Sequence, residues 1–188
     1  MDKKIIMGTL LMAGCLSLSI STIAWSDDDD FGGEGGFYGR TTDVPVVTNK
    51  RYASECGSCH FAYQPGWLPK RSWKKLMGSL DNHFGENAEL DDATRTEITN
   101  YLVGRAADVI PSRMSARIRA SIGPDETPLR ISELRFMQHE HNEIPVRLIK
   151  GNPKVGSRSN CLACHTQAAG GYFNEHGVNI PGYGRFED

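Results

Sequence analysis

Cys56-Gly57-Ser58-Cys59-His60 is the stretch that decides how this chain folds, and Cys161-Leu162-Ala163-Cys164-His165 repeats its pattern. In each stretch two residues separate a pair of cysteines, and a histidine follows the second cysteine. The chain has 188 residues and five cysteines, four of which lie in these motifs. With this composition, one C-x-x-C-H motif arises by chance in roughly one chain in several hundred. Two copies in one chain are therefore not accidental.

The spacing of these motifs suits covalent haem attachment. Thiols at positions i and i+3 can form thioethers to the two vinyl groups on one edge of a haem, and the next histidine then lies beneath the iron. We predict two covalently bound haem c groups. The attachment residues are Cys56, Cys59, Cys161 and Cys164. The predicted proximal iron ligands are His60 and His165.

Zinc and disulfides are the alternatives to haem. Zinc sites with four cysteines usually keep their pairs within about 15–20 residues of each other, whereas Cys59 and Cys161 lie about a hundred residues apart. Disulfides are common in exported proteins. Neither alternative accounts for the histidine after each pair, and a thioredoxin-like redox pair needs a βαβ setting that the sequence does not indicate. The motifs favour haem.

The N-terminus predicts export to the periplasm. Two lysines precede a mostly apolar run over residues 5–23, and the small residues Ala24 and Ser26 suit a signal peptidase. We predict a signal peptide over 1–26 and no stable membrane insertion after its removal. Serines in the run and the acidic residues after it favour cleavage over a retained anchor. Lipidation at Cys15 is a further alternative, although Met12 stands where such a site normally has leucine.

The charge of the chain argues against nucleic acid as a partner. The formal net charge is −2, and removal of the signal peptide takes away two lysines and one aspartate. The remaining chain is mildly acidic and has no long basic block, so nucleic-acid binding has no electrostatic support.

The remaining chain divides into a leader and two haem domains. Residues 27–45 are acidic and glycine-rich, which predicts a flexible leader. We place the first haem domain at 46–111 and the second at 112–188. Helical patterns fill the first domain, and the second becomes loop-like after Pro145, so the predicted fold class is mainly α. We expect the second domain to be largely unfolded without its haem.

Apolar periodicity predicts the helices. In the first domain they begin at Thr48, at Ser72, and at Asp91 or Asp92. The first of these helices carries both thiols and His60 on one face. The apolar stripe of the helix that begins at Ser72 runs to Phe84. In the second domain a short helix surrounds Ile118. A longer one spans 128–144, with Ile131, Leu134, Met137, His141 and Ile144 along one side.

Each iron also needs a candidate ligand on the side opposite its proximal histidine. Besides His60 and His165, the chain has four histidines. They are His83, His139, His141 and His176. His83 borders the apolar stripe of its helix and is the candidate for the first haem, with a surface role as the alternative. Met77 shares that face, but a methionine among Trp73, Leu76 and Leu80 more often packs in the core.

For the second haem, helical geometry separates two neighbours. His139 and His141 are two residues apart and point to nearly opposite sides of a helix. His141 falls with the apolar residues and is favoured, whereas His139 falls with polar ones. His176 lies in a loop and stays an alternative. Three arginines are candidates for neutralising haem propionates, with solvated surface as the alternative: Arg71, Arg105 and Arg158.

Two histidines on each iron would leave no open site for oxygen or peroxide. A second histidine in place of methionine also stabilises ferric iron and lowers the reduction potential. This ligation favours electron transfer and predicts that the chain is not an enzyme. The rival hypothesis is a dihaem enzyme, such as a peroxidase or small-ligand reductase, with one open iron.

Several longer stretches resemble the bacterial dihaem cytochrome c family, often abbreviated DHC. They are ECGSCHFAYQPGWLPKRSWKKLMGSLDNHFGENAELD, the stretch from HNEIP to GNPKVGS, NCLACHT and IPGYGR. The resemblance covers roughly Thr48 to Arg185. It implies an N-terminal domain similar to class I cytochromes c and a smaller C-terminal haem domain with little regular structure.

The resemblance also implies two low-spin haems with two histidine ligands each. The distal ligand of the first haem falls in DNHFGE, at His83, and that of the second falls in HNEIP, at His141. Relatives act as periplasmic electron donors. The partners implied are redox proteins such as a small oxygen-binding monohaem cytochrome, with electron input from a membrane cytochrome b.

Overall fold

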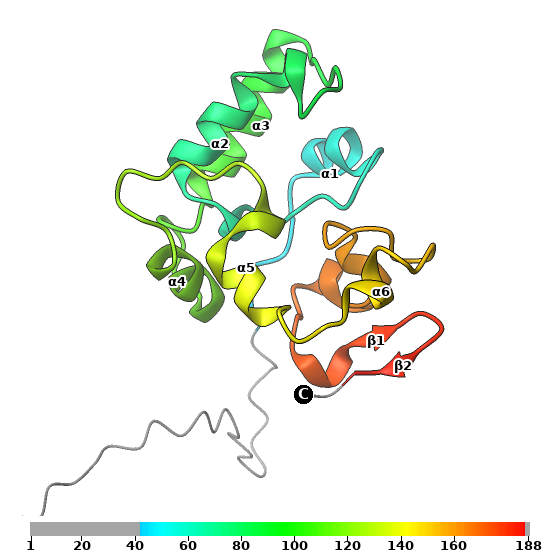
Figure 1. The fold of residues 1–188 in the computed structure, drawn as a ribbon. Coiled ribbons are helices and arrows are strands. Elements are labelled where there is room, and N and C mark those ends of the chain that lie inside the picture. Colours follow the sequence, from blue (N-terminus) through cyan, green and yellow to red (C-terminus); the bar gives the residue numbers. More distant parts are fainter. Residues whose placement is uncertain (1–41, 187–188) are drawn as a thin grey trace, which may run out of the picture. The chain divides into compact units, whose positions relative to one another are not determined.

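The computed structural model of the chain describes residues 42–186 (Figure 1). The predicted signal peptide, Cys15 within it and most of the predicted leader lie outside the described residues. The helices are α1 (Lys50–Gly57), α2 (Lys70–Met77), α3 (Asp92–Gly104), α4 (Arg113–Ala120), α5 (Arg135–Glu140) and α6 (Val146–Ile149). The mainly α fold is confirmed. No helix between residues 42 and 186 is long and apolar enough to cross a bilayer.

A small sheet that the sequence did not predict lies near the C-terminus (Figure 1). Its strands are β1 (Asn179–Ile180) and β2 (Gly184–Arg185), which pair antiparallel with Asn179 opposite Arg185. Ile180 is buried in a small apolar cluster with Ile149 and Val155. Strands of two residues are too short to show the alternation by which a strand is found in a sequence.

Helix α1 begins and ends at different residues from those predicted. Asn49 rather than Thr48 is the cap, and its side-chain oxygen accepts a 2.7 Å hydrogen bond from the Tyr52 amide. The helix ends at Gly57, so Cys59 and His60 lie beyond it and do not share its face. Glycine and serine are weak helix formers, which explains why the helix stops inside the motif.

Helices α2 and α3 pack against each other (Figure 1). The stripe predicted to run to Phe84 breaks at Gly78, after which Leu80–Asn82 form a short 3-10 turn. The Phe84 side chain is 42% exposed, so its assignment to the apolar stripe was wrong. Asp91, one of the two predicted caps of α3, accepts a 3.0 Å hydrogen bond from the Thr94 amide.

The long helix predicted over 128–144 is two shorter elements. A 3-10 turn covers Ile131–Glu133, and α5 follows after Leu134. Leu134 has extended backbone angles, and its side chain is buried in the core. Leucine is a strong helix former, so the burial of its side chain in the core overrides its helix propensity at this position.

The main apolar core draws residues from both predicted haem domains. Tyr52, Trp67, Ile98 and Leu102 come from the first, and Ile118 and Phe136 come from the second. Helices α4 and α5 therefore share a core with α1 to α3. Gly66 allows this approach, since a Cβ there would lie 2.7 Å from the Ser115 hydroxyl oxygen on α4.

Residues at the start of the described chain also pack closely. Val44, which the sequence analysis placed in the leader, is fully buried. The amides of Asp43 and Val44 donate hydrogen bonds of 2.9 and 3.3 Å to the Gly171 carbonyl. In return the Asp43 carboxylate accepts a 2.7 Å hydrogen bond from the Phe173 amide. This segment thereby joins the chain just after the second C-x-x-C-H motif.

Candidate haem sites

The four motif cysteines are free thiols in the structure. Cys56 lies on α1 and Cys59 in the turn after it, whereas Cys161 starts a 3-10 turn (Cys161–Ala163) that Cys164 follows. Burial raises the pKa of Cys56 and of Cys161 to about 11 each, so both thiols stay protonated at neutral pH. Neither C-x-x-C pair is joined as a disulfide in the structure.

A shared four-cysteine zinc site is also absent from the described part of the chain. No group of three or more histidine, cysteine, aspartate or glutamate side chains among residues 42–186 is arranged to hold a metal ion. The two motifs therefore do not form one shared metal site in this part of the chain.

The first pair of histidines is His60 and His83. Their ring centroids lie 6.1 Å apart and the rings are nearly parallel, at 17°. The Nδ1 atom of His60 lies 2.8 Å from the Phe61 carbonyl oxygen. A hydrogen bond from Nδ1–H to that oxygen leaves Nε2 unprotonated, which is the form of imidazole that binds a metal.

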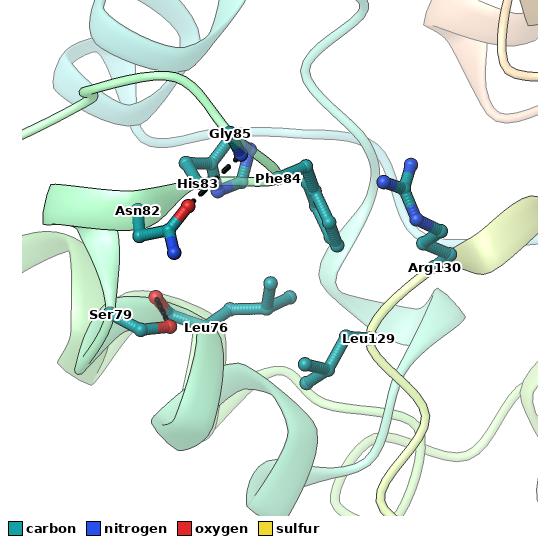
Figure 2. Close-up of a pocket in the computed structure, with 8 residues that line it drawn as sticks. All are labelled: Leu76, Ser79, Asn82, His83, Phe84, Gly85, Leu129 and Arg130. Carbon is teal, nitrogen blue, oxygen red and sulfur yellow. Dashed lines mark hydrogen bonds between the residues drawn. The ribbon is translucent and has the colours of Figure 1, made fainter.

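A tight turn after α2 holds His83 (Figure 2). The His83 amide donates a 2.7 Å hydrogen bond to the Glu86 carbonyl, and the Gly85 amide donates a 3.1 Å bond to the Asn82 side-chain oxygen. Phe84 and Gly85 both have positive φ, 59° and 103°. Only glycine adopts such angles without cost, so the local sequence DNHFGE encodes the turn. His83 therefore stands on this turn and not on the helix predicted for it.

A pocket of about 260 Å³ lies beside His83 (Figure 2). Leu76 and Leu129 give it apolar walls, and Arg130 stands 3.9 Å above the Phe84 ring. Within the described residues the buried Nδ1 atom of His83 has no hydrogen-bond partner. Burial, the His60 ring and the Arg130 charge lower the pKa of His83. A neutral imidazole with an unpartnered nitrogen fits a metal ligand. Arg130 was not among the predicted site residues, because it approaches Phe84 only through the tertiary fold.

The second pair is His141 and His165. Their centroids also lie 6.1 Å apart, but the rings are nearly perpendicular, at 76°. His141 follows the end of α5, and its Nδ1 atom lies 2.8 Å from the Met137 carbonyl oxygen. Burial, and then the nearby His141, lower the pKa of His165 to about 4. The His165 ring is therefore a neutral imidazole, and the contact at Nδ1 of His141 leaves the Nε2 atom of that ring available.

The other candidates lie elsewhere. His139 and His176 are exposed, and no ring contact described between residues 42 and 186 involves either of them. Met77 is buried in the main core, as expected for packing.

The three candidate arginines have different partners. Arg71 donates to the backbone carbonyls of Glu126 and Gly123, and Arg105 lies over the Tyr101 ring. Arg158 donates a 3.0 Å hydrogen bond to the carbonyl of His141, so it supports the second histidine pair directly.

The spacing of each pair fits one metal ion between two imidazoles. A metal bonds an imidazole nitrogen at about 2 Å and the ring centroid lies about 1.2 Å farther, so rings on opposite sides of one metal have centroids about 6 Å apart. With two thiols beside each pair, the fold and the sites define a c-type cytochrome with two haems.

Comparison with known proteins gives the family. Residues 52–173 match the family described as dihaem cytochrome c. The chain belongs to this family, and the predicted pair of covalently bound haem c groups is confirmed with it. The chain covers all of the diheme cytochrome c from Shewanella baltica OS155, at 41% identity over 76% of its own length, with a TM-score of 0.63.

A diheme cytochrome c from Rhodobacter sphaeroides is also similar. It is 45% identical over 68% of this chain and 98% of its own, with a TM-score of 0.61. No curated protein matched the chain. The similarity to both solved cytochromes supports the helical fold, and the family match at 52–173 includes both motifs.

Proposed function

We propose that this protein is a periplasmic electron carrier in which each of two low-spin haems lies between two histidines. His60 and His83 are the axial ligands of the first haem. His165 and His141 are those of the second. The protein transfers electrons between redox partners and catalyses no reaction of its own.

The matched spacing of the two histidine pairs carries this proposal. Both pairs have ring centroids 6.1 Å apart, which is the separation that one six-coordinate iron requires. The distal histidines, His83 and His141, come from different elements with different local geometry, so the common spacing is not a by-product of one repeated motif. Among the described residues, neither His139 nor His176 takes part in such a pair.

The local contacts support the same assignment. Backbone carbonyls orient His60 and His141 through Nδ1 and leave Nε2 for the metal. The lowered pKa values of His83 and His165 keep these rings neutral. The haems supply reversible one-electron chemistry between ferric and ferrous iron. His60, His83, His141 and His165 would hold the two irons with one ring nitrogen on each side, and this would leave no position on either iron for oxygen or peroxide.

Export and partners follow from the class of protein. Covalent haem and the predicted signal peptide support a location in the periplasm, and the carrier needs a donor and an acceptor protein there. The family resemblance directs the search for them to a membrane cytochrome b as donor and a small oxygen-binding monohaem cytochrome as acceptor.

Carbon monoxide provides the test. The reduced native protein is expected to bind no carbon monoxide, and the oxidised protein to show no high-spin absorption band. Carbon monoxide binding by one haem would contradict the carrier proposal and favour a dihaem enzyme.

A further inference from the structure

The side chain of Tyr63 connects the ring of His60 to the backbone beside Cys161. Its ring centroid lies 5.5 Å from that of His60, with the planes tilted by 36°. Its hydroxyl donates a 2.7 Å hydrogen bond to the Ser159 carbonyl oxygen. Ser159 precedes Cys161, the first cysteine of the second motif, by two residues. One side chain thus contacts the proximal histidine of the first site and the backbone beside the attachment point of the second.

Tyr63 is held firmly in this place. Its own carbonyl oxygen accepts a 2.7 Å hydrogen bond from the hydroxyl of Tyr52, which is only 2% exposed. The ring of Phe61 packs edge-on against the Tyr63 ring at 5.4 Å. Contacts on the backbone and on the ring therefore restrict the motion of Tyr63, so its hydroxyl stays directed at Ser159.

The Ser159 carbonyl is close to the second haem attachment. The sulfur of Cys161 lies 3.8 Å from the same carbonyl oxygen that accepts the hydrogen bond from Tyr63. Hydrogen bonds from Ser159 to the side chains of Ser157 and Ser132 fix this residue further. The chain of contacts from the His60 ring to the Cys161 sulfur therefore runs through Tyr63 and one carbonyl group.

A second series of aromatic rings is less complete. Trp67 packs edge-on against Phe173 at 4.8 Å, and Phe173 lies 5.5 Å from His165. Among the described residues, no ring contact joins Trp67 to His60 or His83. This series reaches the second histidine pair alone, whereas Tyr63 connects both sites.

We propose that Tyr63 is a positioning residue for electron transfer between the two haems. Its ring and hydroxyl hold the two attachment segments in contact and provide the bonded route between them. With both haems bound, one electron would pass from the ferrous to the ferric iron, so that one iron is oxidised as the other is reduced. Tyr63 keeps its proton and is not itself oxidised. This inference rests on the proposed function, since it requires two haems that exchange electrons.

Tyr63→Phe is the variant that tests this role, because it removes only the hydroxyl. Tyr101→Phe is the matched control: the Tyr101 hydroxyl accepts a 2.9 Å hydrogen bond from the Thr48 amide, away from the second motif. The half-reduced holoprotein is studied by exchange NMR on the haem methyl resonances, and rates that persist on dilution are intramolecular. Backbone hydrogen exchange over residues 159–164 gives a second measurement that does not depend on electron transfer.

Tyr63→Phe is expected to slow intramolecular exchange several-fold and to speed hydrogen exchange over residues 159–164. Tyr101→Phe is expected to match the wild type in both measurements. Equal electron-exchange rates in all three proteins would overturn the proposal, as would equal slowing in both variants. Carbon monoxide binding by the wild type would instead contradict the proposed function, so the two failures are distinguishable.

Discussion

The turn that carries His83 depends on residues with positive φ angles. Gly85 has φ of 103°, and a Cβ at this position would meet no atom within 4 Å. The cost of a side chain there is therefore backbone strain alone. Phe84 already takes a positive φ of 59°, and Arg130 stacks on its ring.

Gly85→Ala is expected to destabilise the protein by about 1 kcal/mol or more, because alanine disfavours a positive φ. Gly104→Ala is the control: Gly104 also has open space around its Cβ position but no positive φ, and alanine there should be neutral or slightly stabilising. Denaturant unfolding of both variants measures the difference. Similar effects of the two changes would show that the turn is not under this constraint.

At the level of elements, the observed helix α1 differs from the predicted one in its N-cap, which is Asn49 and not Thr48. The Asn49 side chain bonds the Tyr52 amide and also donates to Glu97, whereas the hydrogen bond from Thr48 uses only its backbone amide. Asn49→Ala should cost about 1 kcal/mol of unfolding free energy, as is typical for loss of an N-cap.

Thr48→Ala is the matched control for this element and should change the unfolding free energy by less than about 0.5 kcal/mol. Chemical denaturation of the two single variants shows whether Asn49 or Thr48 is the N-cap that stabilises α1. A larger loss for Thr48→Ala than for Asn49→Ala would favour the cap expected from the sequence.

The two motifs could be predicted from the sequence, whereas much of the structure around them could not. Five consecutive residues with the C-x-x-C-H spacing indicate covalent haem attachment, so both attachment sites were predictable from these residues alone. The ends of helices were not, since Leu134 breaks a helix through burial and α1 stops at Gly57 inside the motif. Arg130 contacts Phe84 and Tyr63 contacts Ser159, and each contact joins residues far apart in the chain. A local apolar pattern does not indicate such contacts.

At the level of the whole molecule, a buried amide joins the segments that follow the two motifs. Gln64 is completely buried; its nitrogen donates a 2.6 Å hydrogen bond to the Ala168 carbonyl, and its oxygen accepts a 2.9 Å bond from the Trp67 indole. Gln64→Ala leaves both partners unsatisfied, at a cost of about 1–3 kcal/mol for each buried group.

Gln64→Ala is therefore expected to lower the melting temperature clearly, while Gln138→Ala, on the exposed face of α5, should leave it nearly unchanged. Calorimetry of the two holoproteins measures this. A melting temperature unaffected by Gln64→Ala would mean that the segments do not stabilise each other through this amide.

The proposed axial ligands are tested most directly by electron paramagnetic resonance of four histidine-to-alanine variants. Ligand planes at 17° and 76° split the iron orbitals differently, so the wild type should show two distinct low-spin ferric signals. His83→Ala should convert the near-parallel signal to high spin, and His141→Ala the near-perpendicular one. His139→Ala and His176→Ala should retain both signals. Loss of a low-spin signal in either of these two, with His141→Ala unchanged, would contradict the assignment of the second haem.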